Sequence, residues 1–206
     1  MDDAHDDDDD LLERWRAGDK RAGNALFERH FRSLVRFFRN KVSTGIEDLV
    51  QETLLACLRG RDRLRDDNSF RAYMFGTARF QLYEHLRRSA KQEVDVEEHS
   101  VADLAPGLST AYAKKHEQRL LLDALRRLPI EYQVTLELYY WEGLSGPELA
   151  AALGIPEPTV RGRIRRGSER LKVEMEKLAA SPELLTSTLG DLEGWLAQLK
   201  ETCARG

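Results

Sequence analysis

From Leu11 onward, the hydrophobic positions of this chain repeat with the three- and four-residue spacing of amphipathic helices. Runs of β-branched residues that alternate with polar ones are missing, and Leu, Ala, Arg and Glu are frequent throughout. We therefore predict an all-α protein. Its expected helices span residues 10–17, 19–40, 46–59, 69–90, 111–127, 130–142, 145–153, 157–178 and 182–203.

Two of these helices begin with the pattern of a capping box, in which a hydroxyl and a carboxylate three residues later bond each other's backbone N–H. Thr44 with Glu47 is the first candidate, and Ser145 with Glu148 is the second. Gly143, just before the second box, suits the left-handed residue that ends a helix. These residues predict a sharp break between the helices on either side of 143–145.

Residues 145–171 have the spacing of a helix-turn-helix. Ala150 lets two helices cross closely, Gly154 makes the turn, and Val160 seats the second helix on the first. Arginines gather on the outward side of the second helix, and such side chains pair with phosphates and read guanine edges in the major groove. A solvated basic face is the alternative, but five Arg within 161–170 favour DNA binding.

The helical pattern lapses between Lys91 and Thr110, where the sequence is acidic and contains Pro106 and Gly107, as linkers do. We expect two small helical domains joined by a flexible acidic linker, with the helix-turn-helix in the second domain. The expected parts are a disordered acidic tail at 1–10, a first module at 11–91, the linker at 92–110, a second module at 111–178 and a C-terminal helical extension at 179–206.

Charge is distributed unevenly along the 206 residues, whose formal net charge is −4. Seven Asp and no basic residue occupy 1–10, whereas 11–91 hold 18 Lys and Arg against 10 Asp and Glu. The basic first module indicates a polyanionic partner. We interpret the acidic N-terminal run as a solvated tail. The alternative is that it covers the basic DNA-binding surfaces of the protein.

The composition and motifs of the chain also argue against disulfides, metal sites, catalysis and membrane insertion. Cys57 and Cys203 are too few for a disulfide framework or a zinc site. No phosphate-binding loop or nucleophile–base arrangement is visible, so we expect no enzyme activity, cofactor, metal or small-molecule substrate. The sequence shows no apolar run long enough to span a membrane and no secretion signal, so we expect a cytoplasmic protein without membrane insertion.

The expected helix at 69–90 has two faces. Met74, Ala78, Leu82 and His85 form a stripe that should be core. The opposite side carries aromatic and basic residues, which either stack on unpaired bases or pack under neighbouring helices, and periodicity does not choose between these roles. That side is formed by Tyr73, Gly76, Phe80, Tyr83 and Arg87.

The expected helix at 46–59 exposes an acidic face that includes Glu47 and Asp48. A metal site is disfavoured because no His lies beside these carboxylates. A solvated face and a protein-docking surface both remain open.

Three segments resemble the sigma factors of bacterial RNA polymerase, in family order. IEDLVQETLLACL at 46–58 is similar to the polymerase-binding helix, and FRAYMFGTARFQLYEHLRR at 70–88 resembles the −10-recognition and melting helix. Residues 125–171, with Leu-Pro near the start and Glu-Gly-Leu-Ser before the turn, resemble the −35-binding domain. The resemblance covers about residues 10–178. With these two domains only, the chain looks like the extracytoplasmic-function (ECF) group of the sigma-70 family.

The resemblance implies roles for individual positions. Asp48, Gln51 and Glu52 would face the coiled-coil clamp of core RNA polymerase, and the loop 65–69 would hold a flipped −10 base. The residues implied for −10 recognition and melting are Asn68, Arg71, Tyr73, Arg79, Phe80, Tyr83, Arg87 and Arg88. The residues implied for −35 recognition are Thr159, Arg161, Gly162, Arg165 and Arg166. The linker would thread through the polymerase.

The function that the resemblance implies is a sigma factor that binds core RNA polymerase, directs it to promoter DNA and assists strand opening. An anti-sigma factor or other regulator is a further expected partner. The residues themselves leave two other functions open, which are a helix-turn-helix regulator that acts without polymerase and a protein-interaction module that sequesters another regulator. The apolar stripe of the C-terminal extension favours packing on the second module over binding a regulator.

Overall fold

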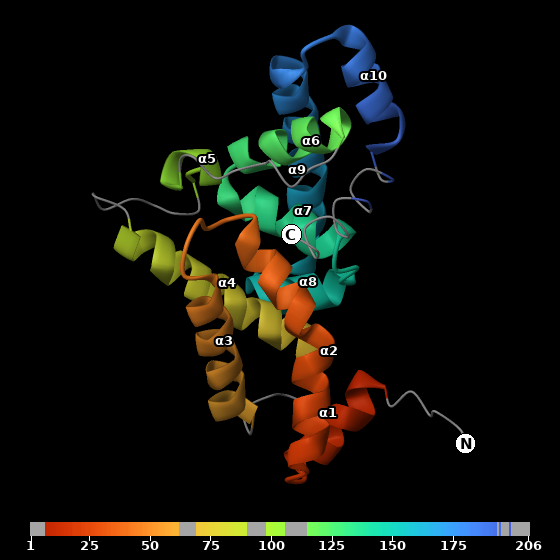
Figure 1. The fold of residues 1–206 in the computed structure, drawn as a ribbon. Coiled ribbons are helices and arrows are strands. Elements are labelled where there is room, and N and C mark those ends of the chain that lie inside the picture. The colour runs from red at the N-terminus through yellow and green to blue at the C-terminus, as the bar shows by residue number, and fades with distance from the viewer. Residues whose placement is uncertain are drawn as a thin grey trace.

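The computed structural model of this chain describes residues 7–61, 69–89, 98–105, 115–192, 194 and 198. Over these residues every named element is a helix (Figure 1), which confirms the predicted all-α class. The elements are α1 (Asp8–Arg16), α2 (Lys20–Arg39), α3 (Ile46–Gly60), α4 (Phe70–Ser89), α5 (Val101–Leu104), α6 (His116–Arg127), α7 (Ile130–Tyr140), α8 (Gly146–Leu153), α9 (Glu157–Leu178) and α10 (Pro182–Gly190).

The signals that mark helix boundaries are confirmed at one site and wrong at another. Ser145 and Glu148 form the predicted capping box of α8, and Gly143 has a φ of +64°. The box predicted at Thr44 does not form, because Gly45 occupies the cap of α3 with a φ of +74° and no side-chain bond. A left-handed turn, which glycine adopts freely, starts α3 instead.

The acidic N-terminus is partly ordered, which corrects the prediction of a disordered tail over 1–10. Asp7 caps α1 by accepting the Asp8 N–H at 2.6 Å. Asp8 also pairs with Arg29 at 2.7 Å and with His30 at 2.6 Å, both on α2. Carboxylates are favourable at a helix N-terminus, and these have basic partners within reach. Residues 1–6 lie outside the described part.

The first module packs around an aromatic core. The ring of Trp15 on α1 lies edge-on to Phe27 at 5.3 Å and to Phe70 at 6.1 Å between centroids. Gly23 makes room for it, because a Cβ there would lie 2.4 Å from Cδ1 of Trp15. This cluster joins α1, α2 and the start of α4.

The second module surrounds its own apolar cluster, which includes Leu121, Leu125, Trp141 and Met175. α9 approaches α7 closely, since a Cβ at Gly167 would lie 3.3 Å from the side chains of α7. α10 folds back on this cluster, as expected for the C-terminal extension, and α10 ends at Gly190. Most of residues 193–203, where the predicted helix continued, lie outside the described residues. The leucines that make this contact are Leu184, Leu185, Leu189 and Leu192.

Part of the predicted linker is ordered. Ser100 and Asp103 form a capping box at α5, and Val101 is fully buried. The Ile130 N–H donates to the His99 carbonyl at 2.9 Å, which ties this segment to the start of α7. The prediction of a linker without regular structure is therefore wrong for 98–105, because an apolar side chain within the acidic run reaches the core.

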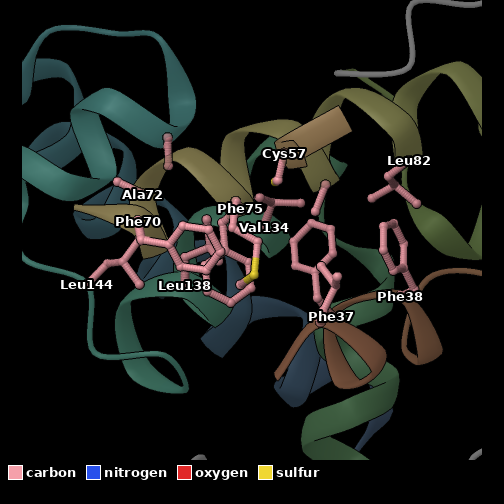
Figure 2. Packing of buried hydrophobic residues seen from close by; sticks show 14 of the residues in the cluster. Phe37, Phe38, Cys57, Phe70, Ala72, Phe75, Leu82, Val134, Leu138 and Leu144 are labelled. Atoms are coloured by element: carbon pink, nitrogen blue, oxygen red, sulfur yellow. The ribbon is translucent and has the colours of Figure 1, made fainter. Parts of the chain in front are cut away.

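The two modules are docked together, which the sequence analysis did not predict. Figure 1 shows α4 crossing α8, while the end of α2 reaches towards α6 and α7. Phe70 and Phe75 of the first module belong to the same buried cluster as Val134, Leu138 and Leu144 of the second (Figure 2). The largest continuous core of the protein therefore crosses the boundary between the modules.

Candidate DNA-binding and protein-docking surfaces

α8 and α9 form the predicted helix-turn-helix. Gly154, with a φ of +67°, makes the turn, and Val160 is fully buried between the helices. Pro158 lies in the first turn of α9, where its fixed φ suits a helix and its missing N–H has no helical acceptor to lose. The motif therefore presents α9 on a defined scaffold.

Glu148 is the side chain that starts the helix-turn-helix and also touches the first module. It accepts the Ser145 N–H at 2.8 Å and the hydroxyl of Ser69 at 2.7 Å. Burial alone would raise the pKa of Glu148, but the hydrogen bonds from Ser145 and Ser69 outweigh burial and lower the pKa. The carboxylate is thus held ionised by the groups around it.

The arginines of α9 separate into two sets. Arg163 pairs with Glu131 at 2.7 Å, and the Arg170 guanidinium lies 4.7 Å from the Tyr132 ring, so these two hold α9 against α7. Arg161 and Arg165 point outward, with 75% and 68% of their side chains exposed.

The residues predicted to read the −35 element share the outer side of α9. Thr159 and Arg166 are exposed, and Gly162 is partly buried one turn before Arg166. A Cβ at Gly162 would lie 3.5 Å from the guanidinium of Arg166, so the glycine lets this arginine lie along the helix. The structure therefore brings the predicted −35 residues together on one surface.

α4 confirms three of the four residues of its predicted core stripe, the exception being His85, which is only partly buried. Met74, Ala78 and Leu82 are fully buried, whereas Phe80 is 60% exposed. Tyr83 is 5% exposed, so of the two roles left open for this ring, packing under the neighbouring helices is the one that its burial favours. α3 packs on one side of α4 and α8 on another, so little of the helix surface remains in water.

The basic side chains of α4 also fall into two groups. Arg71 donates to the carbonyl oxygen of Glu142, and the Arg79 guanidinium lies 5.3 Å from the centroid of the Tyr83 ring. Arg87 and Arg88, at the far end, are exposed.

Two other predicted −10 positions lie near the start of α4. Tyr73 is half-buried, and its hydroxyl occupies the space that a Cβ at Gly60 would need. Asn68, with the rest of 65–68, lies outside the described residues.

A largely apolar groove of about 670 Å³ opens between α2 and α3. Three of its side chains are large hydrophobics with substantial exposure, namely Phe31 at 47%, Leu55 at 39% and Leu58 at 46%. The contribution of α2 to this groove was not predicted from the sequence. The signal was the pair Phe31 and Val35, four residues apart and therefore on one helix face. An exposed apolar groove of this kind is a candidate protein-docking surface.

Asp48, Gln51 and Glu52 are exposed on α3, as predicted, and Gln51 lines the groove. The charge of Glu52 also acts on His85 of α4. Burial and the nearby Arg88 lower the pKa of His85, and Glu52 opposes this shift. Arg39, Glu47 and Gln51 line the groove beside its apolar floor, so the polar part of the lining carries both signs of charge.

Cys57 carries a free thiol. Cys57 is fully buried, and burial raises the pKa of its thiol to about 12, which keeps it protonated and unreactive. Among the residues that the structure describes, no three His, Cys, Asp or Glu side chains gather as metal ligands would. No described helix is long and apolar enough to cross a membrane.

A helix-turn-helix with outward arginines, joined to a helical module with an exposed apolar groove, defines a two-module helical DNA-binding protein. Each module matches a different region of one sequence family. Sigma-70 region 2 matches residues 26–92, and Sigma-70 region 4 matches residues 118–171. The chain belongs to the sigma-70 family of RNA polymerase sigma factors.

Similar proteins agree with this assignment. The ECF RNA polymerase sigma-E factor of Haemophilus influenzae is 27% identical over 179 residues, covering 82% of this chain and 95% of that protein. The RNA polymerase sigma factor NccH of Alcaligenes xylosoxydans xylosoxydans is 28% identical, covering 80% and 92%. A solved structure of CnrH in complex with the cytosolic domain of CnrY shares 26% identity with a TM-score of 0.61, covering 84% of this chain and 99% of that chain.

Proposed function

We propose that this sigma factor divides its work among three surfaces, so that it binds core RNA polymerase, directs it to promoters and assists strand opening. The observation that carries the proposal is the sorting of the α9 arginines. Arg163 and Arg170 hold α9 against α7, whereas Arg161, Arg165 and Arg166 lie on its outer side. Arg161 and Arg165 pair there with Glu157 and Glu169, and these pairs are exposed, so DNA phosphates can replace the carboxylates.

The α2–α3 groove is the proposed polymerase-docking surface. Its apolar floor supplies buried area on binding, and the exposed Asp48, Gln51 and Glu52 beside it supply the polar contacts that fix orientation. Phe31 joins the site as a residue that sequence reasoning did not include. Leu55 and Leu58 complete its exposed apolar part.

The exposed rim of α4 is the proposed −10 surface. Phe80 offers a ring on which an unpaired base can stack, and Arg87 and Arg88 offer charge to the DNA backbone. Strand opening on this proposal needs no covalent chemistry from the chain, because unpaired bases are captured by stacking. We assign no catalytic step to it, and we place it in the cytoplasm, where polymerase and chromosome are found.

The deciding experiment mixes the purified full chain with core RNA polymerase from the source organism. We expect the two to co-elute on size exclusion, and we expect the mixture to initiate transcription from a subset of genomic fragments. Dimeric binding to operator-like duplex without any affinity for polymerase would instead favour a polymerase-independent regulator. Initiation that is equal on every template would contradict promoter selection.

A regulatory protein is a further proposed partner. The structural relative CnrH was solved in complex with another protein, the cytosolic domain of CnrY. For the present chain, the α2–α3 groove is the exposed apolar surface best suited to such a partner. A regulator bound there would compete with polymerase, which a displacement assay with the purified complex would measure.

A further inference from the structure

The outer side of α9 carries two carboxylates as well as its arginines. Arg161 donates to Glu157 at 2.5 Å, and Arg165 donates to Glu169 at 2.9 Å, each across one turn of the helix. All four side chains are at least one-third exposed. The helix therefore supplies a carboxylate to two of the arginines that would otherwise meet DNA unpaired.

The two carboxylates are placed in different ways. Glu157 lies in the first turn of α9, where a negative charge is favourable. At Gly146, the first residue of α8, a Cβ would lie 3.0 Å from Oε1 of Glu157, so the glycine leaves room for this carboxylate beside Arg161. Glu169 lies in the interior of α9, where neither end of the helix stabilises its charge, and Arg165 is the cation that it contacts.

Each pair leaves most of the arginine's hydrogen-bond donors available. A guanidinium carries several N–H donors in a planar fork, and the pairs use one terminal nitrogen each, Nη2 of Arg161 and Nη1 of Arg165. The remaining nitrogens can bond O6 and N7 of a guanine, which carry no net charge, while the carboxylate stays in place. A phosphate brought to the same arginine is repelled by that carboxylate. Guanine edges and phosphates are therefore not equivalent acceptors for a paired arginine.

Arg166 differs from both paired arginines. Its side chain is exposed on the same side of α9 and lies over Gly162, and within the described part of the chain no carboxylate pairs with it. Arg166 can bind a phosphate without giving up an ionic partner. The outer side of α9 thus combines one unpaired cation with two cations that are already held.

We propose that Glu157 and Glu169 are specificity-determining residues, which hold Arg161 and Arg165 for guanine edges and oppose their binding to phosphate. This inference rests on the proposed function, because it takes the outer side of α9 as the −35 surface. At the correct sequence the pairs persist while the arginines contact bases. On unrelated duplex the arginines turn to phosphates, and the carboxylates left behind are repelled by the DNA. The carboxylates therefore weaken binding to unrelated DNA more than binding to the −35 sequence.

The test compares two duplexes bound by the full chain assembled with core RNA polymerase. One duplex carries the −35 sequence of a promoter that the holoenzyme selects, and in the other that sequence is scrambled. Glu169→Gln keeps the size of the side chain and removes its charge. We expect it to raise affinity for the scrambled duplex about threefold, in keeping with the strength of an exposed ion pair, and to change affinity for the −35 duplex less. Glu157→Gln should act in the same way through Arg161. Fluorescence anisotropy gives both affinities and their ratio.

The salt dependence on the scrambled duplex gives a second readout. In the unmodified protein, a Glu169 carboxylate released beside phosphates takes up a cation, which cancels the counterion that Arg165 displaces from the DNA. In Glu169→Gln this cancellation is lost, so the plot of log affinity against log salt should steepen by about 0.9. Arg166→Ala removes an unpaired cation and should make the plot shallower by a similar amount. Glu176→Gln makes the same charge change at an exposed position further along α9 and should alter neither readout.

The proposed role of Glu169 requires Arg165, which a double-mutant cycle tests. In an Arg165→Ala background, Glu169→Gln should leave the ratio of the two affinities unchanged. If Glu169→Gln raises both affinities equally, with or without Arg165, the carboxylate acts by general repulsion and the proposal is overturned. If Arg165→Ala by itself leaves the ratio unchanged, α9 does not read this sequence, and the −35 assignment fails together with the inference. Failure of the chain to bind core polymerase would instead contradict the proposed function itself.

Discussion

The guanidinium of Arg36 lies 2.6 Å from the carboxylate of Glu142, 106 positions further along the chain, and both side chains are more than nine-tenths buried. Each charge is tolerable in the interior only because the other module supplies its partner. The two modules therefore determine each other's position, although each matches a separate region of the sigma-70 family.

The Lys41–Glu137 pair should show how strongly this contact depends on matched charges. Glu137→Leu leaves the fully buried ammonium of Lys41 without its carboxylate, and we expect a loss of about 3–5 kcal/mol in the free energy of unfolding. Lys41→Met with Glu137→Leu removes both charges and should recover part of that loss, because the buried amides of Asn40 and Gln133 still lose the carboxylate to which they donate. Urea denaturation measures both. Glu169→Ala, which breaks an exposed pair with Arg165, should cost less than about 1 kcal/mol.

Removing an outward arginine of α9 should weaken promoter binding without weakening the fold. Arg165→Ala is expected to cost about 1–3 kcal/mol in affinity for duplex −35 DNA, with relaxed sequence preference at the position it reads. Fluorescence anisotropy of the holoenzyme on promoter fragments measures this loss. Lys172→Ala removes the same charge further along α9 and should lower affinity less. Equal losses for the two variants would mean that Arg165 contributes charge alone.

Arg163 should behave differently from its neighbours. Its pairing with Glu131 is largely shielded from solvent, so Arg163→Ala should lower the urea midpoint of unfolding. Any loss of DNA affinity should follow from the altered seating of α9 on α7. A full loss of DNA binding at unchanged stability would contradict the sorting of these arginines into structural and DNA-facing sets.

The α2–α3 groove should be the surface most sensitive to an added charge in polymerase binding. Leu58→Lys places an ammonium in the apolar floor, which must be desolvated on docking, and we expect at least a tenfold rise in Kd for core polymerase, or about 1.4 kcal/mol. Val173→Lys is a matched control, because Val173 and Leu58 are both 46% exposed but lie on different modules. Similar affinities for the two variants would remove the groove from the proposal.

The acidic start of α1 should make stability depend on pH through Asp8. Burial alone would raise the pKa of this carboxyl, but the hydrogen bonds and charges of His30 and Arg29 outweigh burial and hold the pKa below its ordinary value of 3.8. A carboxyl with a depressed folded pKa stabilises the fold above its unfolded pKa, and that contribution disappears as pH falls through the folded pKa.

Asp8→Asn should therefore be less stable than the unmodified protein at about pH 5–6, and the difference should shrink as pH drops below about 3.8. Thermal unfolding across this range gives the comparison. Asp9→Asn removes a carboxylate from the same first turn, where the side chain is exposed, and should show a smaller difference. If the two variants follow the same pH curve, the effect belongs to the helix terminus rather than to the contact with α2.

Local features were predictable from the sequence wherever a few neighbouring residues decide the conformation. Ser145, Glu148 and Gly143 define the start of α8, because a capping box and a left-handed glycine depend on backbone groups close by. The helix-turn-helix spacing and the outward side of α9 followed in the same way. Thr44 shows the limit, since Gly45 offered a competing cap.

What the sequence by itself determined is the all-α class, most helix positions, the helix-turn-helix and the resemblance that names the family. The tertiary structure alone decided that Tyr83 is buried, that Phe31 lines the α2–α3 groove and that Glu142 pairs with Arg36. The reason is physical. Helical periodicity tells which side chains share a face of one helix, whereas burial and ion pairing depend on which distant helix covers that face.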